Sequence, residues 1–396
     1  SRKLFIKREM VLMFILRMLL EVAVIIILFV IVGLIAVKMI FKRKGKKKLS
    51  IKKVKTVVFD VKKVKEDVAI PAVKGKDEPA YYEILQGLHD IAEDKNIKKV
   101  IIDVDKLNLT LAQMEEISKI FDKIRKNKEV VAIGTLFDES RYRQALFADK
   151  IYMFDTRQSS LIFRGYLHKE MYLKSFLEKF GIRMNVLHIG NYKVAGEKYS
   201  HNEMSEEKKE SIKNIKDKVF ESFVKLVKDK RGTDIEEEIL NGNLIFAGKE
   251  KALEYKLIDG AADYDEIGIN YREDTVSIED YISISKEKKE KAKDTIAVIN
   301  LEGVIDVRNP KKNITYENVC DKLEILEKMK NLKGLVLRIN SPGGSALVSE
   351  KIYKKLKKLT VPIYVSMGDL CASGGYYIAT TGRKLFANSI TLTGSI

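Results

Sequence analysis

The sequence contains no tryptophan and is poor in proline, histidine and cysteine, with five, four and two of each in 396 residues. The two cysteines, Cys320 and Cys371, form no CxxC pair, which argues against a disulfide framework or a zinc site. The four histidines show no spacing typical of metal ligands, and no Ser-His-Asp arrangement is visible. We therefore expect no cofactor or metal, and a serine nucleophile in this chain would need a base other than histidine.

Acidic residues are outnumbered, since 56 Asp and Glu stand against 73 Lys and Arg and the formal net charge is +17. Nucleic-acid binding is one interpretation of such a charge. The lysines, however, alternate with glutamates along most of the chain and lack the interleaved aromatic residues of nucleic-acid grooves. We therefore expect solvated helix faces and no nucleic-acid partner, around a core that the 45% hydrophobic content can supply.

The longest apolar run lies in residues 1–50. The 20 residues from Met18 to Val37 contain one charged residue, Glu21, and have the length that one bilayer crossing needs. A cleaved signal peptide is the alternative, but the run is longer than such a segment and no A-x-A-like cleavage site follows it. We predict a single-pass membrane anchor in 1–50. Basic residues flank both of its ends, seven of them between Lys38 and Lys48, so the positive-inside rule alone slightly favours a cytoplasmic body.

Strand-like and helix-like patterns alternate twice along the rest of the chain. The first series predicts strands over 56–61, 100–104 and 130–133, with helices over 83–92 and 111–126. The second predicts strands over 295–300, 334–340 and 361–367, with helices over 316–329 and 346–359. Such βαβ alternation is typical of a parallel sheet with right-handed crossovers. We expect a first α/β repeat over 51–285, a charged linker over 286–294, and a second α/β repeat over 295–396.

One candidate for chemistry is Ser373, which follows a buried strand and precedes Gly374-Gly375 and a helical pattern. A serine at such a strand-to-helix turn lies at a helix N-terminus, where free backbone N–H groups point outward. That geometry suits a nucleophile with half of an oxyanion hole already present. The alternative is a tight packing turn in which serine and glycine are simply small.

A second glycine-containing turn favours the interpretation of Ser373 as a nucleophile over that of a packing turn. The strand Gly334–Asn340 runs into Ser341-Pro342-Gly343-Gly344-Ser345 and then into a helical pattern. Two turns at the carboxyl ends of neighbouring parallel strands face the same crevice. Gly343 or Gly344 could then share one oxyanion with Gly374.

The run SPGGS…MGDLCASGGYYIA…ANSITLTGSI resembles the signal peptide peptidase A (protease IV) family, peptidase family S49, in its long duplicated form. The resemblance covers nearly the whole chain from about residue 50 onward. It implies tandem crotonase/Clp-protease-like repeats and a Ser-Lys dyad. By motif, Ser373 matches the family nucleophile, Lys193 in GNYKVAGE matches the general-base lysine, and Ser395 in TGS matches the serine that hydrogen-bonds and orients that lysine.

The first repeat aligns with the second when Gly134–Tyr142 is set on Gly368–Tyr376. In this register Glu139 occupies the nucleophile position and both glycines are lost, so the first repeat should keep the fold, lack acylation machinery and supply Lys193. A lysine acts as a base when burial or a nearby cation lowers its pKa, and a cleft between the repeats could bury Lys193. Without the family match, Lys193 would be one more surface lysine.

The residues around Lys193 allow further expectations. Residues 183–190 look strand-like, and 201–230 look helical. His188, five residues before Lys193, is interpreted as a partly buried structural histidine rather than a catalytic base. Glu197 either helps to position the lysine loop or forms a surface salt bridge.

The resemblance implies a membrane-anchored serine endopeptidase that degrades cleaved signal peptides, taken as extended apolar segments. It also implies a homo-oligomer, a tetramer in the family, with a catalytic body on the extracytoplasmic side of the cytoplasmic (inner) membrane. The rivals are an acyl-CoA enzyme of the crotonase type, a broader membrane protein quality-control protease and an inactive membrane scaffold. The last gains weight if the protein ends at Ile396, but we expect a longer protein, because the first repeat continues far beyond its matching point.

Overall fold

The structure, a computed structural model, describes residues 18, 54–61, 79–267, 275–286, 293–310 and 312–395. The chain divides into two units, residues 1–50 and residues 51–396. The expected membrane anchor falls in the first unit and, apart from Met18, lies outside the described residues. No helix within the described ranges is both long and apolar enough to cross a bilayer. Most of the expected linker, 287–292, also lies outside them.

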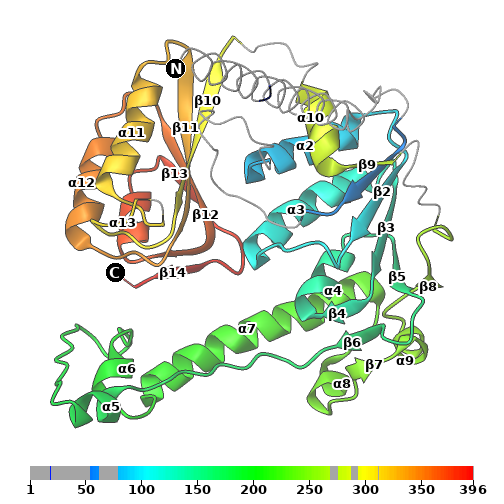
Figure 1. The fold of residues 1–396 in the computed structure, drawn as a ribbon, viewed down its shortest axis with the longest axis horizontal. Coiled ribbons are helices and arrows are strands. Elements are labelled where there is room, and N and C mark those ends of the chain that lie inside the picture. The colour runs from blue at the N-terminus through cyan, green and yellow to red at the C-terminus, as the bar shows by residue number, and fades with distance from the viewer. Residues whose placement is uncertain are drawn as a thin grey trace, which may run out of the picture. The chain divides into compact units, whose positions relative to one another are not determined.

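The first repeat is built on a six-stranded sheet in the order β8-β5-β3-β2-β1-β9, in which every pair of neighbours is parallel (Figure 1). All four side chains of β1 are buried, as a parallel strand covered on both faces requires. The strands are β1 (Thr56–Phe59), β2 (Lys99–Asp103), β3 (Glu129–Gly134), β5 (Lys150–Phe154), β8 (Gly260–Ala262) and β9 (Thr275–Ser277).

Helices α2 (Tyr81–Glu93), α3 (Leu111–Ile124) and α10 (Ile278–Lys286) belong to the same repeat. Helix α3 begins at Thr110, whose side chain accepts a hydrogen bond from the backbone of Gln113 while Gln113 caps Thr110 in return. Its apolar residues recur at helical spacing, and Ile117, Phe121 and Ile124 are fully buried. The cap and this apolar face explain why the predicted helix forms where it does.

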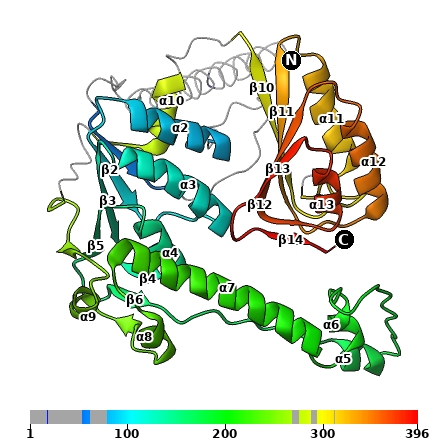
Figure 2. The ribbon, with the colours of Figure 1, turned by 180° about the vertical axis from the view of Figure 1, so that it is seen from behind.

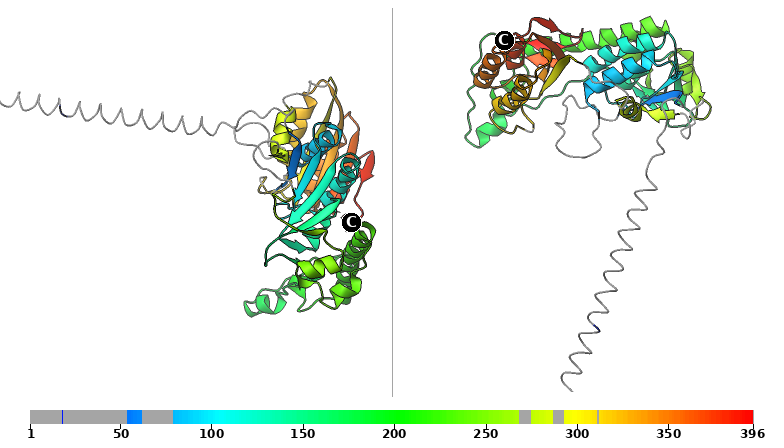
Figure 3. Two further views of the ribbon diagram at one scale, coloured as in Figure 1. Left: turned by 90° about the vertical axis from the view of Figure 1, so that its right-hand side faces the viewer. Right: turned by 90° about the horizontal axis from the view of Figure 1, so that it is seen from above.

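The second repeat has its own parallel sheet, in the order β10-β11-β12-β13, with β14 pairing β12 beyond the end of β13. Figure 3 shows its strands, coloured yellow to red, as a sheet separate from that of the first repeat. The elements are β10 (Thr295–Glu302), α11 (Tyr316–Glu327), β11 (Leu332–Ser341), α12 (Ala346–Leu356), β12 (Ile363–Ala372), α13 (Gly374–Ala379), β13 (Lys384–Phe386) and β14 (Leu392–Gly394).

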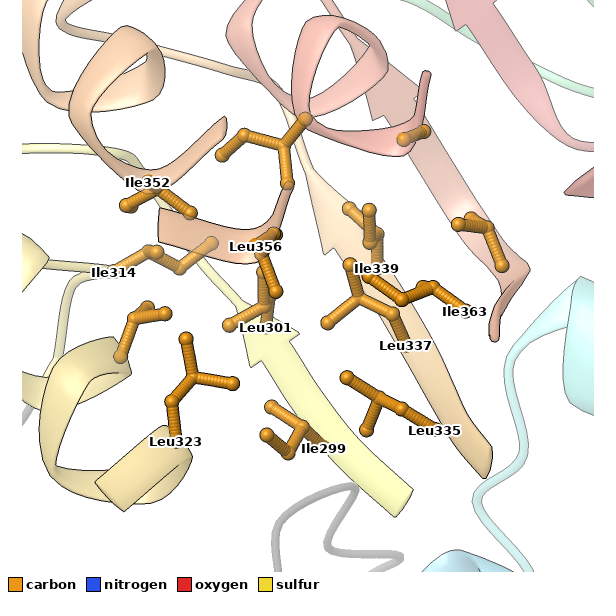
Figure 4. Close-up of a cluster of buried hydrophobic side chains, with 14 of the residues drawn as sticks. Ile299, Leu301, Ile314, Leu323, Leu335, Leu337, Ile339, Ile352, Leu356 and Ile363 are labelled. Atoms are coloured by element: carbon orange, nitrogen blue, oxygen red, sulfur yellow. The ribbon is translucent and has the colours of Figure 1, made fainter. Parts of the chain in front are cut away.

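The core of the second repeat lies between this sheet and its helices (Figure 4). Leu337 of β11 is fully buried, as are Leu323 of α11 and both Ile352 and Leu356 of α12. Burying one such side chain is worth about 1.5–3 kcal/mol, so this cluster holds the sheet and helices together. The carboxyl ends of β11 and β12 emerge from the core, and both glycine turns begin there.

The two predicted repeats share part of their order of elements. In the first repeat β3 is followed by β4 (Leu136–Asp138) and then by α4, which begins at Glu139. In the second repeat β12 runs to Ala372 and α13 follows Ser373. Strand β6 (Ser160–Ile162) pairs with β4 as β14 pairs with β12. By the pairing of β4 with β6 and of β12 with β14, Glu139 falls at the position of Ser373, although α4 begins at Glu139 itself and α13 begins one residue after Ser373.

A long helix, α7 (Glu206–Arg231), extends from the region of α4 and β6 to the short helices α5 and α6 (Figure 2). Ser205 caps its start, and Gly232, at φ 69°, ends it at the predicted break. The remaining elements are α4 (Glu139–Ala145), α5 (Lys174–Lys179), α6 (Glu197–Ser200), α8 (Glu236–Leu240), β7 (Ile245–Ala247) and α9 (Lys249–Glu254). We call residues 166–231 the arm.

Two expectations about the arm are wrong. Residues 183–190 form no strand, and most of their apolar side chains are exposed, with Leu187 at 96% and Ile189 at 94%. A strand needs a partner for its backbone hydrogen bonds, and no strand in the described part of this chain pairs with the segment. His188, expected to be partly buried, is exposed, and its Nδ1 lies 2.9 Å from the carbonyl oxygen of Gly190.

Candidate active site

Ser373 stands at the predicted strand-to-helix turn, between the end of β12 and the first residue of α13. Its backbone has φ 51° and ψ −123°, a combination that non-glycine residues rarely adopt. Hydrogen bonds hold the strained residue in place, because its N–H donates to the carbonyl of Gly394 (2.7 Å) and its carbonyl accepts from the N–H of Tyr377 (2.9 Å). Holding such a conformation costs about 1–3 kcal/mol and is typical of functional sites.

The two glycine turns lie against each other, as predicted. A Cβ added to Gly343 would lie 2.7 Å from the backbone nitrogen of Gly374 and 2.7 Å from the Cβ of Ser373. Gly343 and Gly344 have φ of 89° and 149°, which other residues rarely adopt. The close approach of these backbones therefore requires glycine.

The backbone donors at the site differ in their availability. The N–H of Gly343 donates to Oγ of Ser341 (3.1 Å). Within the described residues, the N–H groups of Gly374 and Gly344 have no recorded acceptor. Two unpaired N–H groups beside a serine hydroxyl can stabilise a developing oxyanion. Of the three glycines predicted for this role, Gly374 and Gly344 are therefore the ones whose N–H groups are available within the described residues.

Ser395 lies next to the same turn. Ala372 pairs with Gly394 in the parallel register of β12 and β14, so Ser395 and Ser373 follow the two paired residues. Ser395 is exposed and has φ 56°. The structure therefore gathers Ser373, Ser395 and the three glycines predicted to bind an oxyanion at one edge of the second sheet.

Lys193 lies elsewhere. It is exposed, in the irregular stretch between α5 and α6, and no hydrogen bond in the described residues joins it to Ser373 or Ser395. The expectation that a cleft between the repeats buries Lys193 is wrong for this single chain. The loop is nevertheless anchored, because the buried Glu197 accepts hydrogen bonds from Oγ (2.5 Å) and N–H (3.4 Å) of Ser205, the cap of α7. Glu197 thus ties α6 to the start of α7, and no salt bridge of Glu197 is found within the described residues.

Glu139 has a structural role at the equivalent position of the first repeat. Its buried carboxylate accepts hydrogen bonds from the backbone N–H groups of Arg164 (2.5 Å) and Gly165 (2.7 Å). These residues follow β6, the counterpart of β14. In the first repeat, Glu139 thus holds the segment that follows β6 against the start of α4.

Sequence analysis missed a set of polar residues that links the two repeats. Arg338, 5% exposed in the middle of β11, bonds to Glu116 of α3 (2.6 Å). Asp369 of β12 accepts a hydrogen bond from the backbone of Ala112 in α3 (3.0 Å). The signal for Arg338 was available, because an arginine inside an apolar strand needs a buried partner. The partner of Asp369 has no local signal in the sequence.

Comparison with known proteins finds family matches in two parts of the chain. Residues 122–275 match the model of peptidase family S49, and residues 287–392 match that of Clp protease. The chain therefore contains a peptidase family S49 domain and a Clp protease domain.

The curated relatives include Protease 4 of Haemophilus influenzae, 26% identical over 342 residues, which are 80% of this chain and 55% of that protein. The chloroplastic serine protease SPPA of Arabidopsis thaliana is 30% identical over 329 residues, 77% of this chain and 48% of that protein. The chain spans about half the length of these relatives. Among solved structures, ClpP1 from Listeria monocytogenes matches with 22% identity and a TM-score of 0.19, over 22% of this chain and 46% of that chain.

Proposed function

We propose that this chain is a serine endopeptidase that uses a Ser-Lys dyad. The observation that carries the proposal is the strained Ser373 at the start of α13, with Gly343 packed directly against it and the free N–H groups of Gly374 and Gly344 nearby. The match to peptidase family S49 and relatives that are named as proteases support the same chemistry.

In the proposed reaction a neutral Lys193 removes the proton from Oγ of Ser373, which attacks a peptide carbonyl. The N–H groups of Gly374 and Gly344 bind the oxyanion of the tetrahedral intermediate. The protonated Lys193 then donates its proton to the leaving amine, and water hydrolyses the acyl-enzyme. Ser395 orients the lysine by a hydrogen bond.

The dyad requires Lys193 to reach Ser373, and two routes are open. The arm of the same chain changes its position, or a neighbouring copy supplies the lysine. Exposed apolar side chains along the arm support a homo-oligomer, since a second copy would cover them. They include Leu167, Met171, Phe176, Phe180, Leu187 and Ile189.

We further propose extended apolar peptides, cleaved signal peptides among them, as substrates. Val304 and Val307 flank Ile305, which pairs with Gly344, and Leu347 opens α12 close to the same turn. All three side chains are exposed, at 46%, 64% and 63%. A single-pass anchor in 1–50, with the body on the extracytoplasmic side of the cytoplasmic membrane, would place the site near such substrates.

The test uses a fluorophosphonate probe and an apolar peptide with wild type, Ser373→Ala, Lys193→Ala and Lys198→Ala. Lys198 is a matched control, because it is a lysine of the same arm, placed over the ring of Tyr199. We expect labelling and cleavage in wild type and Lys198→Ala and their loss in the other two. Cleavage by Ser373→Ala would show that the nucleophile is another residue.

Mixing Ser373→Ala with Lys193→Ala separates the two routes to the dyad. Activity restored in the mixture means that a neighbouring copy supplies the lysine. A mixture that stays inactive, although its subunits exchange, means that the lysine and the serine act within one chain.

A further inference from the structure

The strand that carries Ser373 is interrupted just before it reaches the site. Asn340 of β11 stands opposite three residues of β12, 368–370, because the register of the pair shifts at this point. An interruption of this kind is a β-bulge, which bends a strand and re-aims the side chains that follow. Ser373 lies three residues beyond the bulge, so the bulge helps to set the direction of the nucleophile.

The first repeat has a similar clamp, meaning a side-chain oxygen near the end of one strand that accepts backbone N–H groups of the next strand. Oδ1 of Asn340 accepts a hydrogen bond from the backbone N–H of Leu370 (3.1 Å). In the first repeat, Asp105 accepts hydrogen bonds from the N–H groups of Thr135 (2.8 Å) and Leu136 (3.4 Å), between β3 and β4. The repeat without a nucleophile thus also keeps the clamp, which therefore belongs to the fold rather than to the chemistry.

A further contact of the bulge crosses to the first repeat. Oδ1 of Asp369 accepts the backbone N–H of Ala112 (3.0 Å), in the first turn of α3. The N–H groups of a first helical turn have no partner within the helix, and the helix dipole favours a carboxylate there. In the register of the repeats, Thr135 stands where Asp369 stands and has no carboxylate. This contact is therefore specific to the strand of the nucleophile.

The same helix also holds the turn that leads into β14. Glu115 of α3 accepts hydrogen bonds from N–H (2.8 Å) and Oγ (2.6 Å) of Ser389. Glu116 accepts one from Nδ2 of Asn388 (2.7 Å). Because the carbonyl of Gly394 in β14 binds the N–H of Ser373, α3 holds both strands that meet at the nucleophile.

We propose that helix α3 of the first repeat positions the nucleophile of the second, and that Asp369 is the positioning residue that ties the bulge to α3. The proposal rests on Ser373 being the nucleophile of the proposed peptidase. Asp369 acts through the backbone of the residues that follow it. Losing its carboxylate leaves Asn340 bound to the bulge, so the strand stays folded while the direction of Ser373 becomes less well fixed.

The experiment compares Asp369→Ala, Asp369→Asn and Glu327→Ala in the full chain. Asparagine keeps the acceptor oxygen that Ala112 needs. Glu327 is a matched control, because its carboxylate joins α11 to Lys355 of α12 (3.3 Å) without contacting the bulge. We measure the rate of fluorophosphonate labelling of Ser373, and kcat and KM for an apolar peptide. Asp369→Ala is expected to lower the labelling rate and kcat about tenfold, with KM within about twofold, as the loss of one charge-assisted hydrogen bond allows. Asp369→Asn restores most of the rate, and Glu327→Ala matches wild type.

Backbone amide hydrogen exchange gives a readout that is independent of activity. Asp369→Ala is expected to exchange about tenfold faster at Ala112 and in residues 370–374. If the exchange changes but wild type is not labelled at Ser373, the peptidase proposal and the positioning of a nucleophile both fail, and the contact is purely structural. Unchanged exchange and labelling overturn the positioning role. A raised KM with unchanged kcat also overturns it, because Asp369 would then act on substrate binding.

Discussion

Replacing Gly343 by alanine should disable the site with a limited loss of stability. The new methyl carbon would lie 2.7 Å from the backbone nitrogen of Gly374, 2.7 Å from Cβ of Ser373 and 2.8 Å from the carbonyl oxygen of Ala372. Two of these three atoms are backbone, so the overlap cannot be relieved by rotating a side chain. The two turns must move apart, and the N–H of Gly374 then leaves its place beside Ser373.

The magnitudes follow from the geometry. An overlap of this kind costs about 1–3 kcal/mol, and the left-handed φ of 89° adds about 1–2 kcal/mol for alanine. The total is smaller than the stability of about 5–15 kcal/mol that a typical domain has, so the variant should fold. Displacing one oxyanion donor costs about 10²–10³ in rate, which is the expected loss in the labelling of Ser373.

Gly334 in β11, the strand that leads into the turn of Gly343, provides the matched control. A Cβ there would meet its nearest atoms at 3.6 and 3.9 Å, an ordinary contact, and its φ is not in the left-handed region. Gly334→Ala should change stability by less than about 1 kcal/mol and leave labelling unchanged. The assay measures fluorophosphonate labelling rates together with urea unfolding. If Gly343→Ala is labelled at the wild-type rate, Gly343 does not determine the geometry of the oxyanion site and the reasoning is refuted.

Three further predictions concern other groups. Burial raises the pKa of the Cys371 thiol to about 12, so iodoacetamide at pH 8 should leave it unmodified until the protein unfolds, as mass spectrometry can show; alkylation of folded protein would contradict this. Burial raises the pKa of the Glu115 carboxyl, but hydrogen bonds from Ser389 and Lys119 outweigh burial and hold the pKa below 4.5. The folded state therefore gains stability above pH 4.5 and loses it as the pH falls through the lowered value. Ser389→Ala should flatten this part of the pH-stability profile. Glu139→Ala leaves two backbone N–H groups without their acceptor and should lower the free energy of unfolding in urea by about 1.5–3 kcal/mol. The labelling rate of Ser373 should stay at the wild-type value. A lower rate would mean that Glu139 acts on the site.

The sheets and the strand-to-helix turn at Ser373 could be predicted because their signals are local. Strand β11 is an apolar run that is followed by a glycine turn, and each of these signals can be recognised within about ten residues of sequence. The position of Ser373 followed from the small residues around it. The pairing of Glu139 with Ser373 followed from an internal register, which needs nothing beyond the chain itself.

What sequence reasoning missed depends on partners that are distant in the chain. The alternating apolar residues of 183–190 indicate a strand, but a strand forms where another strand accepts its hydrogen bonds. The bulge before Ser373 depends on Asn340, thirty residues upstream of Leu370. The contact of Asp369 with Ala112 spans 257 residues. No periodicity in a single sequence reports such pairs.

The hydrogen bonds of Glu139 limit what a single substitution could achieve in the first repeat. Replacing Glu139 by serine would remove both hydrogen bonds that the carboxylate accepts from Arg164 and Gly165. The new serine would still lack the neighbouring glycines, because Ser140 and Arg141 occupy their positions. One substitution would therefore cost stability without reproducing the turn around Ser373, so the two repeats cannot be made alike at this position one residue at a time.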